Sequence, residues 1–150
     1  METRAQPPID RRSLSRFVKI LYWVMFATVG LYWYVLELLA PPTSPLGPLK
    51  TYIAITALAT AGFVLYWRFA RIAPLLSASG ADPLSPSGAE MSARLTKLRS
   101  YYILCYTLSE AVALYGFVVR MFGGHRADAL PFFAGAVTLF LLCYPRLPKS

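Results

Sequence analysis

The feature that most constrains this chain is a set of four apolar runs. They cover about residues 17–40, 51–69, 98–122 and 129–144, and they are separated by segments rich in proline, glycine or charge. A helix of roughly 20 apolar residues crosses the roughly 30 Å of hydrocarbon in a bilayer. A soluble domain of 150 residues, 57% of them hydrophobic, could not bury so much apolar surface. The sequence therefore predicts an all-α membrane protein: one domain of four transmembrane helices arranged as two antiparallel hairpins.

Helix-breaking residues set the ends of these runs. Pro41 and Pro42 end the first run, the pair Gly123-Gly124 ends the third, and Pro145 ends the fourth. Proline cannot continue a helix, because it lacks the backbone N–H and its ring clashes with the preceding turn. The fourth run is the shortest, so its crossing of the membrane depends most on the exact limits of the helix.

The only long connection lies between the second and third runs, at about residues 73–88, and is rich in proline, serine, glycine and alanine. Such a composition is typical of a mobile loop. At its end, Ser87 and Glu90 have the spacing of a helix capping box. This spacing predicts a helix that begins near Gly88 and continues into the third run.

Basic residues beside the runs predict the orientation in the membrane. The amino-terminal segment, the edges of the long loop and the carboxyl-terminal tail hold twelve of them, and the opposite side holds Lys50, Arg120 and Arg126. Lys and Arg accumulate on the cytoplasmic side of membrane proteins. We therefore expect a multi-pass protein of the cytoplasmic (inner) cell membrane, with both termini and the long loop in the cytoplasm. The segment before the first run should be a basic cytoplasmic lead-in and not a secretory signal.

The net charge of +8 does not predict a nucleic-acid partner, because the basic residues lie at the ends of apolar runs and form no separate binding face. We also find no nucleophile–base pair, no phosphate-binding glycine loop and no metal-ligand cluster in the sequence. Cys105 and Cys143 lack metal-binding or redox spacing and should act as small apolar packing residues. The sequence thus predicts a non-enzymatic protein without catalytic residues, cofactor or metal.

One acidic residue, Glu110, lies in the middle of an apolar run. A charged carboxylate at the bilayer centre costs a few kcal/mol or more, and burial favours the neutral acid. We therefore expect Glu110 to face the other helices and to be largely protonated. Tyr106 and Thr107 lie one turn before it, where their hydroxyls could share its proton. Glu110, Tyr106 and Thr107 are the candidate ion-binding residues.

Small residues predict where helices approach each other closely. Ala113 and Gly116 follow Glu110 on the third run, and the second and fourth runs contain Gly62 and Gly135. In lipid, helix association depends on packing, and small residues let the backbones come close. These four residues are the predicted helix-packing positions.

The stretch from Leu108 to Val119, LSEAVALYGFVV, resembles the carboxylate helix of the rotor proteolipid, subunit c, of F- and V-type ATPases. The resemblance implies that Glu110 corresponds to the carboxylate that binds and releases a proton or sodium ion, and Ala113 and Gly116 to the close-packed face. The chain departs from that family in having one glycine in the second run, a long serine- and proline-rich connection, and its carboxylate on the third span. A distant relative or a convergent motif fits these departures better than a working rotor subunit.

Two functions remain open at this stage. The first is a small accessory or assembly subunit of a membrane complex, in which Glu110 bonds helices together. The second is proton or sodium handling by a proteolipid-like oligomer through Glu110. The expected partners are the lipid bilayer and either other membrane subunits or further copies of the chain, and not nucleic acid.

Overall fold

The computed structural model describes residues 11–39, 42, 47–74 and 88–145. In these ranges the elements are α1 (Arg11–Leu39), α2 (Pro48–Trp67), η1, a π-helical turn (Arg68–Ile72), α4 (Gly88–Met121) and α5 (Arg126–Leu142). The predicted all-α class is confirmed. The start of α4 agrees with the expected helix start, whereas Ser87 and nearly all of the predicted mobile loop at 73–88 lie outside the described residues.

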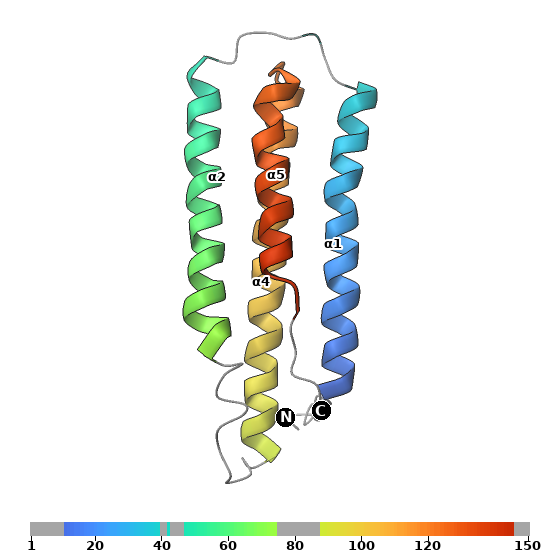
Figure 1. Cartoon of the computed structure of the whole chain (residues 1–150), viewed down its shortest axis with the longest axis vertical. Helices are drawn as coiled ribbons and strands as arrows, with labels where there is room; N and C mark the ends of the chain where they lie inside the picture. Colours follow the sequence, from blue (N-terminus) through green and yellow to red (C-terminus); the bar gives the residue numbers. More distant parts are fainter. Residues whose placement is uncertain (1–10, 40–41, 43–46, 75–87, 146–150) are drawn as a thin grey trace, which may run out of the picture.

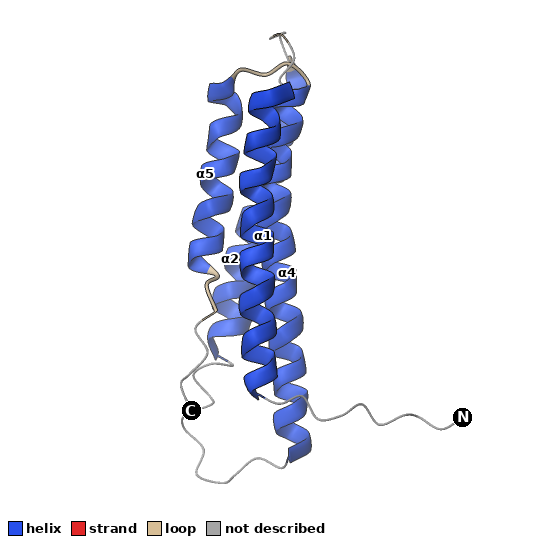
Figure 2. Cartoon of the chain, turned by 90° about the vertical axis from the view of Figure 1, so that its right-hand side faces the viewer, coloured by secondary structure: helices blue, strands red, loops and turns tan. Residues whose placement is uncertain are grey.

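The helices run side by side along the long axis of the molecule (Figure 1). We call the end at which α1 and α4 begin the basal end, and the opposite end the distal end. The chain reaches the distal end through α1, returns through α2 and η1, rises again through α4 and returns through α5 (Figures 1 and 2). The described parts of the chain therefore start and finish at the same end of the bundle.

Helix α4 is the centre of the bundle. It packs most extensively on α5, and then on α1 and α2. In Figure 1, α1 and α2 lie on opposite sides of the α4–α5 pair, and among the described residues they make at most marginal contact with each other. Of the two predicted hairpins, α4–α5 is thus a packed pair, whereas α1 and α2 are antiparallel but separated.

An aromatic cluster fills the basal half of the core. Tyr106 of α4 stacks on Phe140 of α5, with ring centroids 6.0 Å apart, and Tyr22 of α1 meets Tyr106 edge-to-face at 5.7 Å. Tyr106 and Phe140 are completely buried. Such pairs add about 0.5–1.5 kcal/mol to the free energy gained from burial alone. The cluster therefore fixes α1, α4 and α5 relative to one another.

Three helical segments are long and apolar enough to cross a membrane: Arg12–Leu39, Pro48–Ile72 and Ser92–Met121. The α5 helix has 17 residues, and at about 1.5 Å per residue it spans about 26 Å, so a fourth crossing stays a prediction. Large apolar side chains face outward from the bundle, among them Leu58 (75% exposed) and Tyr52 (69% exposed). Water would strongly disfavour so much exposed apolar surface, and lipid would not. These features indicate a membrane protein.

The turn between α4 and α5 forms as the glycine pair predicts. Gly123 has a φ of +95°, a conformation that glycine adopts without a steric cost. The amides of Gly123 and Gly124 donate to the carbonyls of Arg120 and Val119, which is the hydrogen-bond pattern of a Schellman motif. The motif stops α4 abruptly and lets α5 pack directly against it.

Candidate functional site

Glu110 is bonded between two helices of the bundle. It projects from the distal half of α4 toward α1, and its side chain is partly buried. The Thr28 and Tyr32 side chains each place a hydroxyl oxygen 2.9 Å from the same carboxyl oxygen, Oε1 of Glu110. Thr28 and Tyr32 are four residues apart on α1, so both lie on one face of that helix. The carboxyl group therefore links α1 to α4 through two side chains.

Packing against α4 holds the Tyr32 ring in this position. Its centroid lies 5.7 Å from that of Phe117. Because Phe117 follows Glu110 by seven residues, it lies on the same face of α4 two turns later. Glu110 and Phe117 thus form one contact stripe toward α1, with the polar contact next to an aromatic one. The Thr28 hydroxyl is also 2.6 Å from the backbone carbonyl of Met25 within α1.

The hydroxyls of Tyr106 and Thr107, the predicted neighbours of Glu110, make other hydrogen bonds. The Tyr106 hydroxyl donates to the carbonyl of Cys143, at 3.3 Å, and that of Thr107 donates to the carbonyl of Ile103, at 3.0 Å. Tyr106 extends along α4 toward the basal end, because helical side chains point toward the helix amino terminus, and its ring is buried against α5. In this structure the hydroxyls that meet Glu110 come from α1, and ion binding by Glu110, Tyr106 and Thr107 stays a prediction.

The four predicted helix-packing residues have different environments. Ala113 is completely buried, and Gly116 is buried at the contact between α4 and α5. A Cβ added to Gly135 would lie 3.8 Å from Val112, an ordinary contact distance, whereas one added to Gly62 would meet nothing within 4 Å. Ala113, Gly116 and Gly135 therefore lie in the packed region, and Gly62 lies on the exposed surface of α2.

The two cysteines meet across the α4–α5 contact. Cys105 and Cys143 are both free thiols, both are completely buried, and their side chains interact with each other. Their separation in the sequence gives no sign of this contact, since Cys105 lies in α4 and Cys143 directly follows α5. Both residues fill space in the core, as expected for small apolar side chains.

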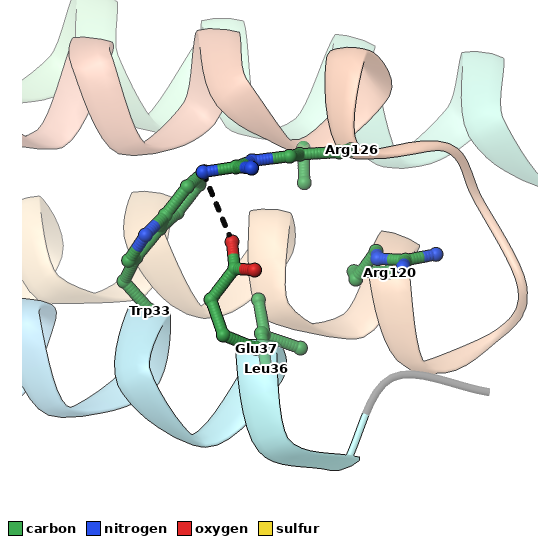
Figure 3. A pocket seen from close by; sticks show the side chains of 6 residues that line it. Trp33, Leu36, Glu37, Arg120 and Arg126 are labelled. Atoms are coloured by element: carbon green, nitrogen blue, oxygen red, sulfur yellow. Dashed lines mark ion pairs between the residues drawn. The ribbon is translucent and has the colours of Figure 1, made fainter.

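A first ion pair joins α1 to α5 at the distal end. Figure 3 shows Arg126 of α5 reaching toward Glu37 of α1, with Nη2 of Arg126 3.2 Å from Oε1 of Glu37. The same guanidinium lies 5.1 Å from the centre of the Trp33 ring. Arg120 points away from this pair and donates to the carbonyl of Gly124, at 2.8 Å. The pair is largely exposed, so it contributes little to stability.

A second ion pair, between Lys50 and Asp128, joins α2 to α5 at the same end. Oδ1 of Asp128 accepts a hydrogen bond from Lys50, and Oδ2 accepts one from the His125 amide at the start of α5, at 3.0 Å. The Lys50 ammonium and the His125 amide lower the pKa of Asp128 below its usual value. Asp128 thus satisfies a free amide of the first helical turn and ties α2 to α5.

Within the described ranges, no group of three or more His, Cys, Asp and Glu side chains could hold a metal ion. Comparisons of the chain with protein-family models, with characterised proteins and with solved structures returned no match. The resemblance of Leu108–Val119 to subunit c therefore stays a prediction. What the fold and the site define is an all-helical protein with three apolar helices of membrane-spanning length and a carboxyl group bonded between two of them.

Proposed function

We propose that this chain is a small, non-enzymatic, multi-pass protein of the cytoplasmic membrane that serves as an accessory or assembly subunit of a membrane complex. In this proposal Glu110 has a structural task, which is to fasten α1 to the central helix α4. The observation that carries it is the pair of hydroxyl contacts, from Thr28 and Tyr32, to one oxygen of Glu110.

The energetics of lipid support this task. A carboxyl group in hydrocarbon is unfavourable unless hydrogen-bond partners satisfy it. Two hydroxyls on the facing helix provide these partners, and each such bond in a membrane protein contributes about 0.6 kcal/mol on average and up to about 1.7 kcal/mol. Two bonds of this size are enough to favour one register of α1 on α4 over a shifted one.

The outer surface of α2 supports a role in assembly. This helix packs on α4 along one side and makes little contact with α1. Much of its remaining surface is apolar and exposed, including Tyr52, Ile55, Leu58 and Tyr66, each at least 55% exposed. Such a surface suits either lipid or the apolar helix of another subunit or a further copy of the chain.

The proposed topology has four crossings, with α5 as the shortest, and the basal end in the cytoplasm. Among the described residues, basic side chains gather at the basal end: Arg12, Arg16, Lys19, Arg68, Arg71, Arg94, Lys97 and Arg99. The distal end has Lys50 and Asp128 in one ion pair and Glu37 and Arg126 in another. This distribution agrees with the preference of Lys and Arg for the cytoplasmic side.

A second candidate function is proton or sodium handling through Glu110. Three side-chain oxygens, from Glu110, Thr28 and Tyr32, meet between α1 and α4, and ionisable residues within membrane segments often mark ion pathways. Reaction with a hydrophobic carbodiimide separates the two candidates. Selective labelling of Glu110 that sodium prevents would favour ion handling, whereas an unlabelled Glu110, or labelling that sodium does not affect, would favour the structural role.

The size of the native assembly tests the proposed function directly. The tagged chain and its Glu110→Leu variant should be extracted from native membranes in a mild detergent, and their sizes compared with the chain purified alone. We expect the wild-type chain to migrate in a complex larger than its own oligomers and the Leu variant to be lost from it. A wild-type chain that migrates only as monomers or self-oligomers, with the same behaviour for Glu110→Leu, would contradict the proposal.

A further inference from the structure

Each contact in the hydrogen-bond network at Glu110 needs one hydrogen. The Thr28 hydroxyl lies 2.6 Å from the carbonyl oxygen of Met25 and 2.9 Å from Oε1 of Glu110. A hydroxyl group has one hydrogen to donate and two lone pairs to accept with. Thr28 therefore cannot donate fully to both oxygens, and one of the two contacts needs a hydrogen from elsewhere.

The distances indicate which contact Thr28 supplies. At 2.6 Å, the approach to Met25 is at the short end of the range for hydroxyl donors, and a carbonyl oxygen has no hydrogen of its own. The Thr28 hydrogen must therefore lie between these two atoms. The lone pairs of the Thr28 oxygen then face Oε1 of Glu110, so the hydrogen in that contact has to come from the carboxyl group.

Tyr32 completes the network without a conflict. Its hydroxyl is 2.9 Å from Oε1 of Glu110, and an acid O–H can donate one hydrogen while accepting another. The result is a directional chain: Tyr32 donates to Glu110, Glu110 donates to Thr28, and Thr28 donates to the carbonyl of Met25. Each of the three hydrogen bonds then contains one hydrogen, and all the groups that take part are neutral.

From this count we infer that the contact between α1 and α4 contains a proton-binding site, in which neutral Glu110 donates its proton to Thr28. The inference deepens the proposed function and rests on it, since the bond between the two helices is the one already assigned to Glu110. It adds that the bond depends on the proton. The ligand of the site is H⁺, and Thr28, Tyr32 and the Met25 carbonyl are the groups that position it.

Loss of the proton would rearrange the site. Ionised Glu110 can only accept, so the Thr28 hydrogen would have to turn from Met25 toward Oε1, leaving the 2.6 Å contact between two acceptors. A carboxylate at this depth is also unfavourable by a few kcal/mol or more. Release of the proton should therefore loosen α1 from α4, and binding of the proton should tighten the contact.

The charged side chains at the distal end of the described structure have partners of their own. Glu37 pairs with Arg126, and Lys50 pairs with Asp128. Arg120 of α4, which donates to the Gly124 carbonyl, follows Glu110 by ten residues, or about 15 Å along the helix. From α1, the facing titratable group is Tyr32, and no interaction with a charged side chain of α2, η1 or α5 is seen at Glu110 in the described ranges. The neutral acid thus needs no counter-ion here.

Infrared spectroscopy of the full chain in lipid vesicles tests the inference. The wild-type spectrum minus that of Glu110→Gln, at neutral pH, should show the carbonyl stretch of a protonated carboxyl group. Thr28→Val should shift this band, because the carboxyl loses its acceptor, whereas Thr28→Ser should leave it nearly unchanged. Glu110→Gln, whose amide also donates a hydrogen, should keep most of the stability of the wild type, whereas Glu110→Leu should lose it.

Two results would show separately whether the proton assignment or the structural role of Glu110 is wrong. Carboxylate bands without the protonated carbonyl band in the difference spectrum would overturn the proton assignment. If Glu110→Leu nevertheless destabilised the bundle, the structural role of Glu110 would stand without it. Equal stability of the wild-type, Gln and Leu proteins at every pH would instead remove the bond between α1 and α4 that the proposed function requires.

Discussion

Gly116 of α4 lies so close to Phe132 of α5 that a Cβ added to the glycine would be 2.8 Å from the Cβ of Phe132. The Ala129 carbonyl would be 3.1 Å away. These neighbours are a backbone oxygen and the first side-chain atom of Phe132, so neither can move without a shift of α5. This close contact between α4 and α5 therefore depends on the absence of a side chain at position 116, as is common in membrane helices.

Gly116→Ala should lower the free energy of unfolding by about 1–3 kcal/mol, the usual cost of an extra methyl group in a filled core. Gly62→Ala is the matched control, because nothing lies within 4 Å of its added Cβ. It should leave stability unchanged or raise it by about 0.4–1 kcal/mol through reduced freedom of the unfolded chain. Reversible unfolding in mixed micelles measures both, and equal effects of the two substitutions would contradict the close approach.

Asp128 should make stability dependent on pH on the acid side. Its pKa is lowered, first by the hydrogen bond from Lys50 and then by the His125 amide. A group whose folded-state pKa is lowered stabilises the protein above its unfolded pKa, near 4, and loses that contribution as the pH falls through the lower folded value. Thermal unfolding between about pH 6 and pH 2 should show the loss in the wild type.

Asp128→Asn is the control for this dependence, because its side chain does not titrate. The variant should be less stable than the wild type above pH 4 and should approach it at the acid end. High salt should reduce the difference, since the pair is partly exposed and therefore screened. If the stability of the two proteins fell equally at low pH, other carboxyl groups would be responsible for the effect.

Arg126 is expected to contribute modestly to stability. Its pair with Glu37 is exposed on both sides, and such pairs contribute about 0.2–1 kcal/mol. Its contact with the Trp33 ring adds about 0.5–1 kcal/mol at an exposed site. Arg126→Ala should therefore cost no more than about 2 kcal/mol, and Glu37→Gln less. A cost of 3 kcal/mol or more, measured in the same unfolding assay, would show that the pair is buried by a partner.

The sequence allowed the helices to be predicted well, because apolar runs and their breakers act locally. The run at 98–122 ends at the glycine pair, where the structure has the Gly123 turn, and the helix predicted to begin near Gly88 does begin there. The arrangement of the helices depends on contacts between distant residues. Consecutive helices usually pack together, and that expectation fails for α1 and α2 because α4 lies between them.

The candidate site was predicted in part. The depth of Glu110 in an apolar run was enough to single it out, but a carboxyl group can turn toward any neighbouring helix. Its hydroxyl partners, Thr28 and Tyr32, are 82 and 78 residues away in the sequence. Their spacing of four on one apolar helix was a usable signal, since two hydroxyls on one face in lipid need a partner. The nearer hydroxyls of Tyr106 and Thr107 have acceptors of their own.

A double-mutant cycle between Tyr32 and Glu110 tests the central claim most directly. The free energy of unfolding should be measured at neutral pH for the wild type, Tyr32→Phe, Glu110→Leu and the double variant. Because the two side chains share a hydrogen bond, we predict a coupling energy of about 0.5–1.7 kcal/mol. Additive effects, with a coupling energy near zero, would contradict the bond between Tyr32 and Glu110 on which this account of the α1–α4 contact rests.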